Sequence, residues 1–359
     1  MDAVGRMVFG ANPAAMVTKQ LILDVLASAA WTRKCASGPT PRSTTRLELL
    51  AERRAAKFFG MRNSRMRFEA MHRGTVVLAL LACGVGRSAL AQGVGGGNPL
   101  MREASQLDTD GNTTRARELF QTVIDSAATP AAKAAAQRAM AMSFAFDGDC
   151  ANTIRYEEMV IAYWVTRETD EPQNAFYQQG EMANEAARIC IDAGKLDDAE
   201  KWYRKGSELG NKEPEPRTHP RRLWDFRLAH ALGRLAAQRG NKAEAQRQIA
   251  SAWKALESDT VMAAQQARYY PYLVGYVAFY TNDLKLAEME LTKAVAIQGN
   301  QRDPFMNYLL ALTYEKQGQH DKAKALYQTA YDLATAHNPP AAFTRPAARK
   351  KLGRTPETP

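Results

Sequence analysis

One spacing of residues recurs six times between residues 99 and 336, and this repetition limits the possible folds more than any other feature of the chain. The clearest copy runs from Pro304 to Ala334 and reads L-A-x2-Y-x3-G-x4-A-x3-Y-x2-A. Its small residues Ala311 and Ala323 would lie where two helices touch, and Gly318 would allow a tight turn between them. A recurring unit of this size is typical of an array of stacked helical pairs.

The other five copies share this frame, with a Gly or Asn at the turn and, in all but one, an Ala after it. Their marker residues, from the last copy to the first, are Gly275, Asn282, Ala287, Leu291 and Ala294; Gly233, Gly240, Ala245, Ile249 and Ala252; Ala187, Gly194, Ala199, Tyr203 and Gly206; Ala141, Gly148, Thr153 and Val160; and Ala104, Gly111, Ala116 and Phe120.

This frame resembles the tetratricopeptide repeat, a pair of antiparallel helices. The resemblance implies an all-α fold, a right-handed superhelical solenoid of about six helix pairs over residues 99–336. The chain departs from the family pattern because the usual Trp early in the first helix is missing and Thr153 replaces a small Ala. A Pro-rich segment, Asn211 to Pro220, lengthens one unit and cannot be helical.

The chain carries a signal-like pattern in residues 66–91. Basic residues between Met66 and Arg73 precede an apolar run that ends at Cys83, and Ala89 and Ala91 form an A-x-A cleavage site. This layout predicts a secretory signal peptide, and the run is too short to span a bilayer. Residues 1–65 are then a disordered segment from an over-long translation start or, alternatively, a real N-terminal extension, and residues 92–98 are a linker.

Cys83 allows a second interpretation, because Leu80-Leu81-Ala82-Cys83 resembles a bacterial lipobox in which the cysteine becomes lipidated. Both interpretations place the protein outside the cytoplasm, in the periplasm or as an outer-membrane lipoprotein. We expect membrane association only if Cys83 is lipidated.

The charge distribution argues against a nucleic-acid partner. Of the formal net charge of +10, residues 1–91 carry +9 and residues 92–359 carry +1. A nucleic-acid-binding protein would need its positive charge on the folded part of the chain. The mean hydropathy of −0.42 also excludes a protein with many membrane spans.

Two cysteines, Cys150 and Cys190, remain after the predicted signal. In the repeat frame Cys150 begins the second helix of its unit, and Cys190 lies late in the first helix of the next. Neighbouring helices of such arrays are antiparallel, so these ends would lie close together, and an exported protein can oxidise the pair. The alternative is two separate buried thiols.

No catalytic or metal-binding motif is present. The histidines His219, His230, His320 and His337 lie in different units or loops, without a ligand at metal spacing. A Gly-rich phosphate loop and a nucleophile elbow are also missing. We therefore expect no enzyme activity, no cofactor and no metal.

The resemblance implies a partner-binding groove lined by the first helix of each unit. Tyr272, Tyr276 and Tyr280 follow one another at intervals of four residues, so they share a helix face, which we expect to be partly exposed. The alternative is that these tyrosines pack between units. The predicted groove comprises Arg138, Asn184, Arg188, Arg227, His230, Arg234, Tyr269, Tyr272, Tyr276, Tyr280 and Tyr308.

Residues 337–359 contain a short capping helix, expected at about residues 346–352, and a basic tail. Together these features predict a non-catalytic scaffold or adaptor of the bacterial cell envelope that binds a protein partner in its groove. The alternatives are a lipid-anchored subunit of an envelope assembly complex and a non-catalytic binder of envelope glycan. The sequence does not identify the partner or the oligomeric state.

Overall fold

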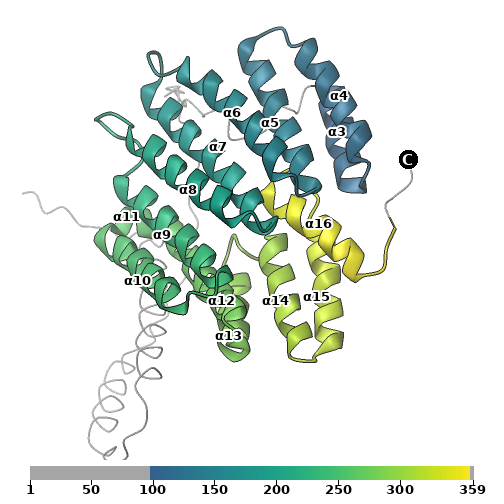
Figure 1. Cartoon of the computed structure of the whole chain (residues 1–359), viewed down its shortest axis with the longest axis vertical. Coiled ribbons are helices and arrows are strands. Elements are labelled where there is room, and N and C mark those ends of the chain that lie inside the picture. Colours follow the sequence, from purple (N-terminus) through teal and green to yellow (C-terminus); the bar gives the residue numbers. More distant parts are fainter. Residues whose placement is uncertain (1–97, 356–359) are drawn as a thin grey trace, which may run out of the picture. The chain divides into compact units, whose positions relative to one another are not determined.

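The computed structural model describes residues 98–355, and these residues form an array of helices without strands (Figure 1). The predicted signal peptide and Cys83 lie outside the described residues. No described helix has the length and apolar character needed to cross a membrane. Twelve helices form the six expected pairs: α3 Pro99–Asp110 with α4 Thr113–Asp125, α5 Pro130–Phe146 with α6 Cys150–Val165, α7 Pro172–Asp192 with α8 Leu196–Asn211, α9 Arg221–Gln238 with α10 Lys242–Ser258, α12 Tyr270–Tyr280 with α13 Leu284–Ala296, and α14 Pro304–Lys316 with α15 His320–Leu333.

The turn inside each pair has the backbone conformation that the frame requires. All six turn positions have positive φ angles, in the left-handed region that Gly and Asn tolerate best. These positions are Gly111, Gly148, Gly194, Gly240, Asn282 and Gly318. The small residue five positions later is buried in every pair, at 2% exposure or less, so the second helix approaches the first closely. The predicted helical repeat array is therefore confirmed.

Two insertions interrupt the regular array. The short helix α11 (Thr260–Gln266) and the 3-10 turn η2 (Ala267–Tyr269) stand between the fourth and fifth pairs, and the sequence frame did not predict them. The Pro-rich segment after α8 is a loop, as expected. It is organised by the buried carboxylate of Glu213, which accepts hydrogen bonds from the backbone N–H groups of Thr218 and His219.

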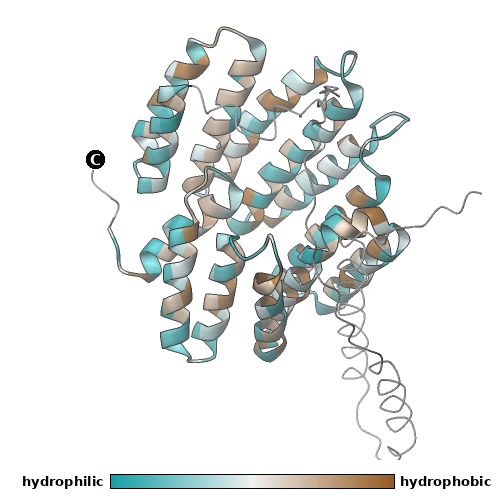
Figure 2. Cartoon of the chain, turned by 180° about the vertical axis from the view of Figure 1, so that it is seen from behind, coloured by the Kyte–Doolittle hydropathy of each residue, from teal (hydrophilic) through white to brown (hydrophobic). Residues whose placement is uncertain are grey.

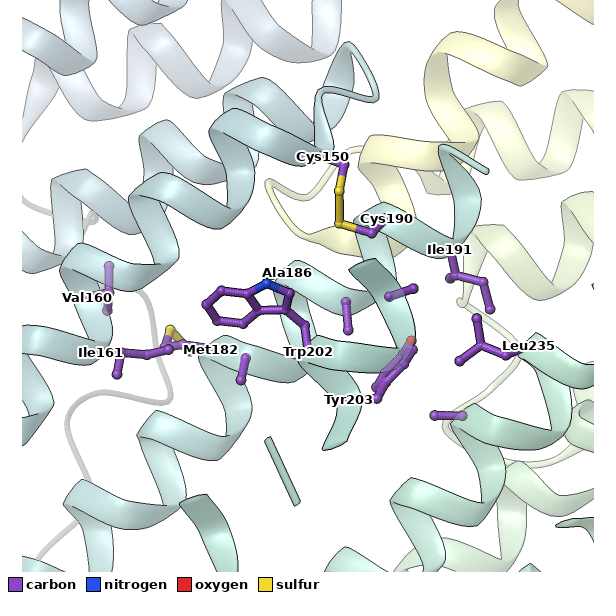
Figure 3. Close-up of a cluster of buried hydrophobic side chains, with 14 of the residues drawn as sticks. Cys150, Val160, Ile161, Met182, Ala186, Cys190, Ile191, Trp202, Tyr203 and Leu235 are labelled. Carbon is purple, nitrogen blue, oxygen red and sulfur yellow. A yellow bond between two sulfur atoms is a disulfide. The ribbon is translucent and has the colours of Figure 1, made fainter. Parts of the chain in front are cut away.

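Apolar and polar residues alternate along the helices (Figure 2), and the apolar faces meet between neighbouring helices. A large part of the core lies among α6, α7, α8 and α9. There Met182 lies beside Trp202, Leu235 lies beside Ile191, and a disulfide joins Cys150 to Cys190 (Figure 3). The disulfide connects the start of α6 to the end of α7, the pairing that the repeat frame predicts.

The last helix, α16, spans Pro339–Lys351 and begins seven residues before the helix expected from the sequence. The expected boundary was wrong because the two prolines at 339 and 340 occupy the first helical turn, where a missing N–H group has no cost. Asn338 caps this turn by accepting a hydrogen bond from the backbone N–H of Ala341 at 3.1 Å. Pro346 lies inside the helix without ending it.

Helix α16 connects the two ends of the array, because it packs against α14 and α15 and also against α5 and α7. The guanidinium groups of Arg345 and Arg349 are buried, and both donate hydrogen bonds to the carbonyl of Thr109 in α3, at 2.5 and 2.6 Å. His337 contacts the buried carboxyl of Asp108 at 2.8 Å. The sequence analysis expected Arg349 in the capping helix and Arg345 outside it, and it did not predict that both would join the last helix to the first pair.

Candidate functional site

The predicted groove residues lie on the first helices of successive pairs, with one exception. Tyr269 belongs to η2 rather than to α12. We call the surface formed by α5, α7, α9, α12 and α14 the first-helix face. The structure places on these helices Arg138, Asn184, Arg188, Arg227, His230, Arg234, Tyr272, Tyr276, Tyr280 and Tyr308.

The predicted exposure of the tyrosine stripe is wrong for two of its three members. Tyr272 and Tyr276 are only 3% and 0% exposed, whereas Tyr280 is 39% exposed. The two buried rings pack because α12 lies against both α9 and α14. The hydroxyl of Tyr276 accepts a hydrogen bond from Nε2 of Gln238 at 2.5 Å. Burial raises the pKa of Tyr272 to about 12, so its hydroxyl stays neutral at physiological pH.

The arginines on the face are already engaged by the protein itself. Arg138 on α5 forms two hydrogen bonds with the carboxylate of Glu185 on α7, one of them at 3.0 Å from its Nε. Arg227 on α9 forms an ion pair with Glu181, also on α7. The sequence analysis missed both carboxylates, since each is separated from its arginine by more than 40 residues. The charges of these two predicted groove arginines are therefore compensated within the protein.

Arg188 and Arg234 lie deeper in the array. Arg234 donates a hydrogen bond to the hydroxyl of Tyr203 at 2.9 Å, and its side chain is buried. The guanidinium of Arg188 lies 5.8 Å from the ring centre of Phe305 and 5.5 Å from that of Phe343 on α16. These cation–π contacts connect the centre of the face to the last helix.

A buried polar cluster surrounds these two arginines. Within the described residues, the buried atoms Arg188 Nε, Asp192 Oδ2, His230 Nε2 and Tyr272 OH have no hydrogen-bond partner. Burial raises the pKa of Asp192 to about 6, although the two arginines oppose this shift. Burial lowers the pKa of His230 well below its usual value, and the same two positive charges add to this effect, so the ring is neutral.

Asn184, the remaining predicted residue on α7, serves the packing of its own pair. A Cβ atom at Gly206 on α8 would lie 2.5 Å from Oδ1 of Asn184, so the two helices need a glycine at this contact. Asn184 therefore lies between α7 and α8.

The last helix covers part of the first-helix face. Helix α16 packs on α5, α7 and α14 more than on α9 or α12, so it covers little of the part of the face formed by α9 and α12. Tyr280 is exposed there, and Tyr308 on the neighbouring α14 is half-buried beside the ring of Tyr327, at 5.4 Å. The sequence analysis did not predict that the chain would occupy part of its own groove.

A cavity of about 580 Å³ lies at the N-terminal end of the face. Its wall is formed by α3, α5, α6, α7 and residues 336–339, and it includes Arg138 with its partner Glu185. The apolar part of the wall contains the buried side chains of Trp164 and Met182. Only Arg138 of these wall residues was predicted from the sequence.

Among residues 98–355, no group of three or more His, Cys, Asp or Glu side chains could hold a metal ion. Comparison with protein families matches residues 306–337 to the tetratricopeptide repeat. This segment contains most of α14 and all of α15, the sixth helical pair. Comparison with curated proteins gives no match.

Proposed function

We propose that this chain, which carries tetratricopeptide repeats, is a non-catalytic scaffold or adaptor that binds a protein partner through its first-helix face. The match of residues 306–337 is the observation that supports this function most strongly, because proteins of this family typically bind other proteins. The other five pairs repeat the same turn geometry and the same close helix contact.

The part of the face formed by α9 and α12, with the adjacent edge of α14, is the binding surface in this proposal. Tyr280 supplies an exposed aromatic ring there, and large aromatic side chains often dominate the energy of protein interfaces. The burial of Tyr272 and Tyr276 removes the stripe of rings on which a glycan could stack. We therefore favour a protein partner over an envelope glycan.

The cell envelope is the proposed location. The signal-like pattern of residues 66–91 supports export, and the bond between Cys150 and Cys190 supports an oxidising compartment. A lipid-anchored subunit of an envelope complex is the variant of this proposal in which Cys83 is lipidated.

Export is tested by the intact mass and the N-terminal peptide of the protein purified from its native host. A chain that begins at Gln92 or at a lipidated Cys83 supports the proposal. A chain that begins at Met1 contradicts it, because the basic segment would then belong to the mature protein.

Binding is tested by co-purification from the native envelope with matched single variants. We expect Tyr280→Ala to lose the bound partner while keeping the helical signal in circular dichroism. Lys254→Ala, an exposed residue on the second helix α10, should retain the partner. Equal recovery with both variants would place the binding surface elsewhere.

A further inference from the structure

The first pairs of the array and the segment that leads into α16 surround a preformed cavity. Its volume is about 580 Å³, and its wall is formed by α3, α5, α6, α7 and residues 336–339. Ordinary ligand pockets have volumes of roughly 300–1,000 Å³. A cavity of about 150 Å³ is sufficient to bind benzene, so this one has room for a molecule of about two or three rings.

Small side chains on α5 leave this space, and larger apolar side chains on the neighbouring helices close it. Ala131, Ala134 and Ala135 lie within about one turn of α5 and line the cavity. Trp164 on α6 and Met182 on α7 are 5% and 1% exposed, so packing fixes their positions in the wall. The cavity therefore exists without a ligand, and binding requires no rearrangement of the helices.

The cavity opens to solvent beside α5, because Ala131 and Arg138 line it and are both exposed. Water that enters the cavity lies against the apolar surface of the alanines and of Val160, which offers it no hydrogen bonds. An apolar ligand that replaces this water gains affinity, because the apolar surfaces of the ligand and of the wall are removed from water together.

The charged groups of the wall are compensated by the protein itself. Arg138 and Glu185 form an ion pair, with two hydrogen bonds between the guanidinium and the carboxylate. His337 contacts the buried carboxyl group of Asp108 at 2.8 Å. These wall residues offer a charged ligand no unpaired counter-charge, so such a ligand would lose its hydration without compensation.

The uncharged polar side chains of the wall also have partners within the protein. The hydroxyl of Ser105 donates a hydrogen bond to the carbonyl of Met101 at 2.8 Å. Nε2 of Gln178 donates to Oδ1 of Asn174 at 3.4 Å, and the side-chain oxygen of Asn338 caps the first turn of α16. The wall therefore does not depend on a polar ligand for its hydrogen bonds, and its remaining surface is apolar.

We propose that this cavity binds an uncharged aromatic molecule of about two or three rings. The rings pack between the alanines of α5 and the side chains of Trp164 and Met182, since an indole and a thioether both make favourable contacts with aromatic rings. The pair of Arg138 with Glu185 excludes charged analogues. A single side chain of a protein partner would leave much of the cavity empty, so the occupant is a small molecule. This site goes beyond the protein-binding face proposed above and does not depend on it.

Fluorescence titration of the full chain with two matched probes tests the proposal. N-phenyl-1-naphthylamine is uncharged, and 1-anilinonaphthalene-8-sulfonate is the same ring system with one sulfonate group. We expect the uncharged probe to bind about tenfold or more tightly than the sulfonate, because the sulfonate meets no free positive charge in the wall. Equal affinities, tighter binding of the sulfonate or no binding of the uncharged probe would each overturn the proposal. This comparison needs no substitution.

A pair of matched substitutions then locates the site. Ala135→Leu fills part of the cavity and should lower the affinity for N-phenyl-1-naphthylamine about tenfold or more. Ala162→Leu makes the same change at an exposed position of α6 outside the cavity wall and should bind the probe normally. Unchanged binding in Ala135→Leu would show that the probe binds elsewhere and would contradict the proposed site.

The selectivity for uncharged molecules is tested by removing the negative partner of Arg138. Because Glu157 on α6 neighbours Glu185, both carboxyl groups are replaced together, in Glu157→Gln with Glu185→Gln. We expect the affinity for the sulfonate probe to rise about tenfold, and that for the uncharged probe to change less than about threefold. Glu158→Gln, at an exposed position of α6, is the control and should leave both affinities unchanged. An unchanged affinity of the double variant for the sulfonate would contradict the role assigned to the ion pair.

Discussion

Replacing Arg345 by Met tests the closure of the array by its last helix. The Arg345 guanidinium donates to the carbonyl of Thr109 at 2.5 Å and reaches the carbonyls of Tyr331 and Ala334 at 3.3 and 3.5 Å. A hydrogen bond from a charged donor contributes about 1.5–3 kcal/mol to the free energy of unfolding, and a buried acceptor left without a donor costs about 1–3 kcal/mol. Release of a buried charge offsets part of this loss, and Arg349 still serves Thr109. We expect a loss of about 2–3 kcal/mol in the free energy of unfolding.

Thermal unfolding followed by circular dichroism measures this loss. For a domain of this size, about 2–4 °C corresponds to 1 kcal/mol, so Tm should fall by about 4–12 °C. Lys350→Met is the matched control, since it removes the same charge from an exposed position of the same helix, and its Tm should change by less than about 2 °C. Equal Tm values for the native chain and Arg345→Met would refute the role assigned to α16.

Three further predictions concern the interior. Tyr276→Ala should cost about 3–5 kcal/mol in chemical denaturation because the ring is buried, whereas Tyr280→Ala should cost less than about 1 kcal/mol. The pKa of Asp192 is raised to about 6 in the folded state, so the folded protein binds this proton more tightly than the unfolded chain does. The contribution of Asp192 to the free energy of unfolding therefore falls as the pH rises from about 4 to 7. Relative to Asp192→Asn, the native chain should lose about 2–3 kcal/mol over this range, and a constant difference between the two would contradict the shift. The double variant Cys150→Ala with Cys190→Ala opens a loop of 40 residues and should lose about 3–4 kcal/mol; equal guanidinium midpoints for this variant and the oxidised native chain would refute a stabilising disulfide.

Local spacing predicted the helical pairs well, because each pair depends on residues close together in the sequence. The Gly or Asn at each turn and the small residue after it were sufficient to find all six pairs. The pairing of Cys150 with Cys190 also followed from this frame, since the two residues occupy neighbouring helix ends.

The same frame could not predict which groove residues are buried or which partners they contact. Whether Tyr272 is exposed or buried depends on how α9 and α14 approach α12, and periodicity within α12 carries no information about that approach. The partners of Arg138 and Thr109 are separated from them by 47 and by more than 200 residues. Contacts of this kind are fixed by the curvature of the whole array.

The basic C-terminal segment illustrates the same difficulty. From the sequence alone, it was interpreted as a short capping helix at about residues 346–352 and a basic tail. Two of its arginines, Arg345 and Arg349, find carbonyl groups that other helix ends leave without partners. Whether an arginine is buried or exposed depends on the carbonyl groups that can accept its hydrogen bonds. For Arg345 and Arg349 the shared acceptor, the carbonyl of Thr109, is more than 200 residues away in the sequence.

Site-specific photo-crosslinking in the native host tests the central claim, that the part of the face formed by α9, α12 and α14 binds a protein partner. A photoreactive amino acid replaces Tyr280 or Tyr308 on this part of the face, and Lys254 on α10 serves as the control position. We predict a cross-linked envelope protein, the same one at both tyrosine positions, and none at Lys254. Cross-links only at Lys254, or at none of the three positions, would contradict the proposed binding surface.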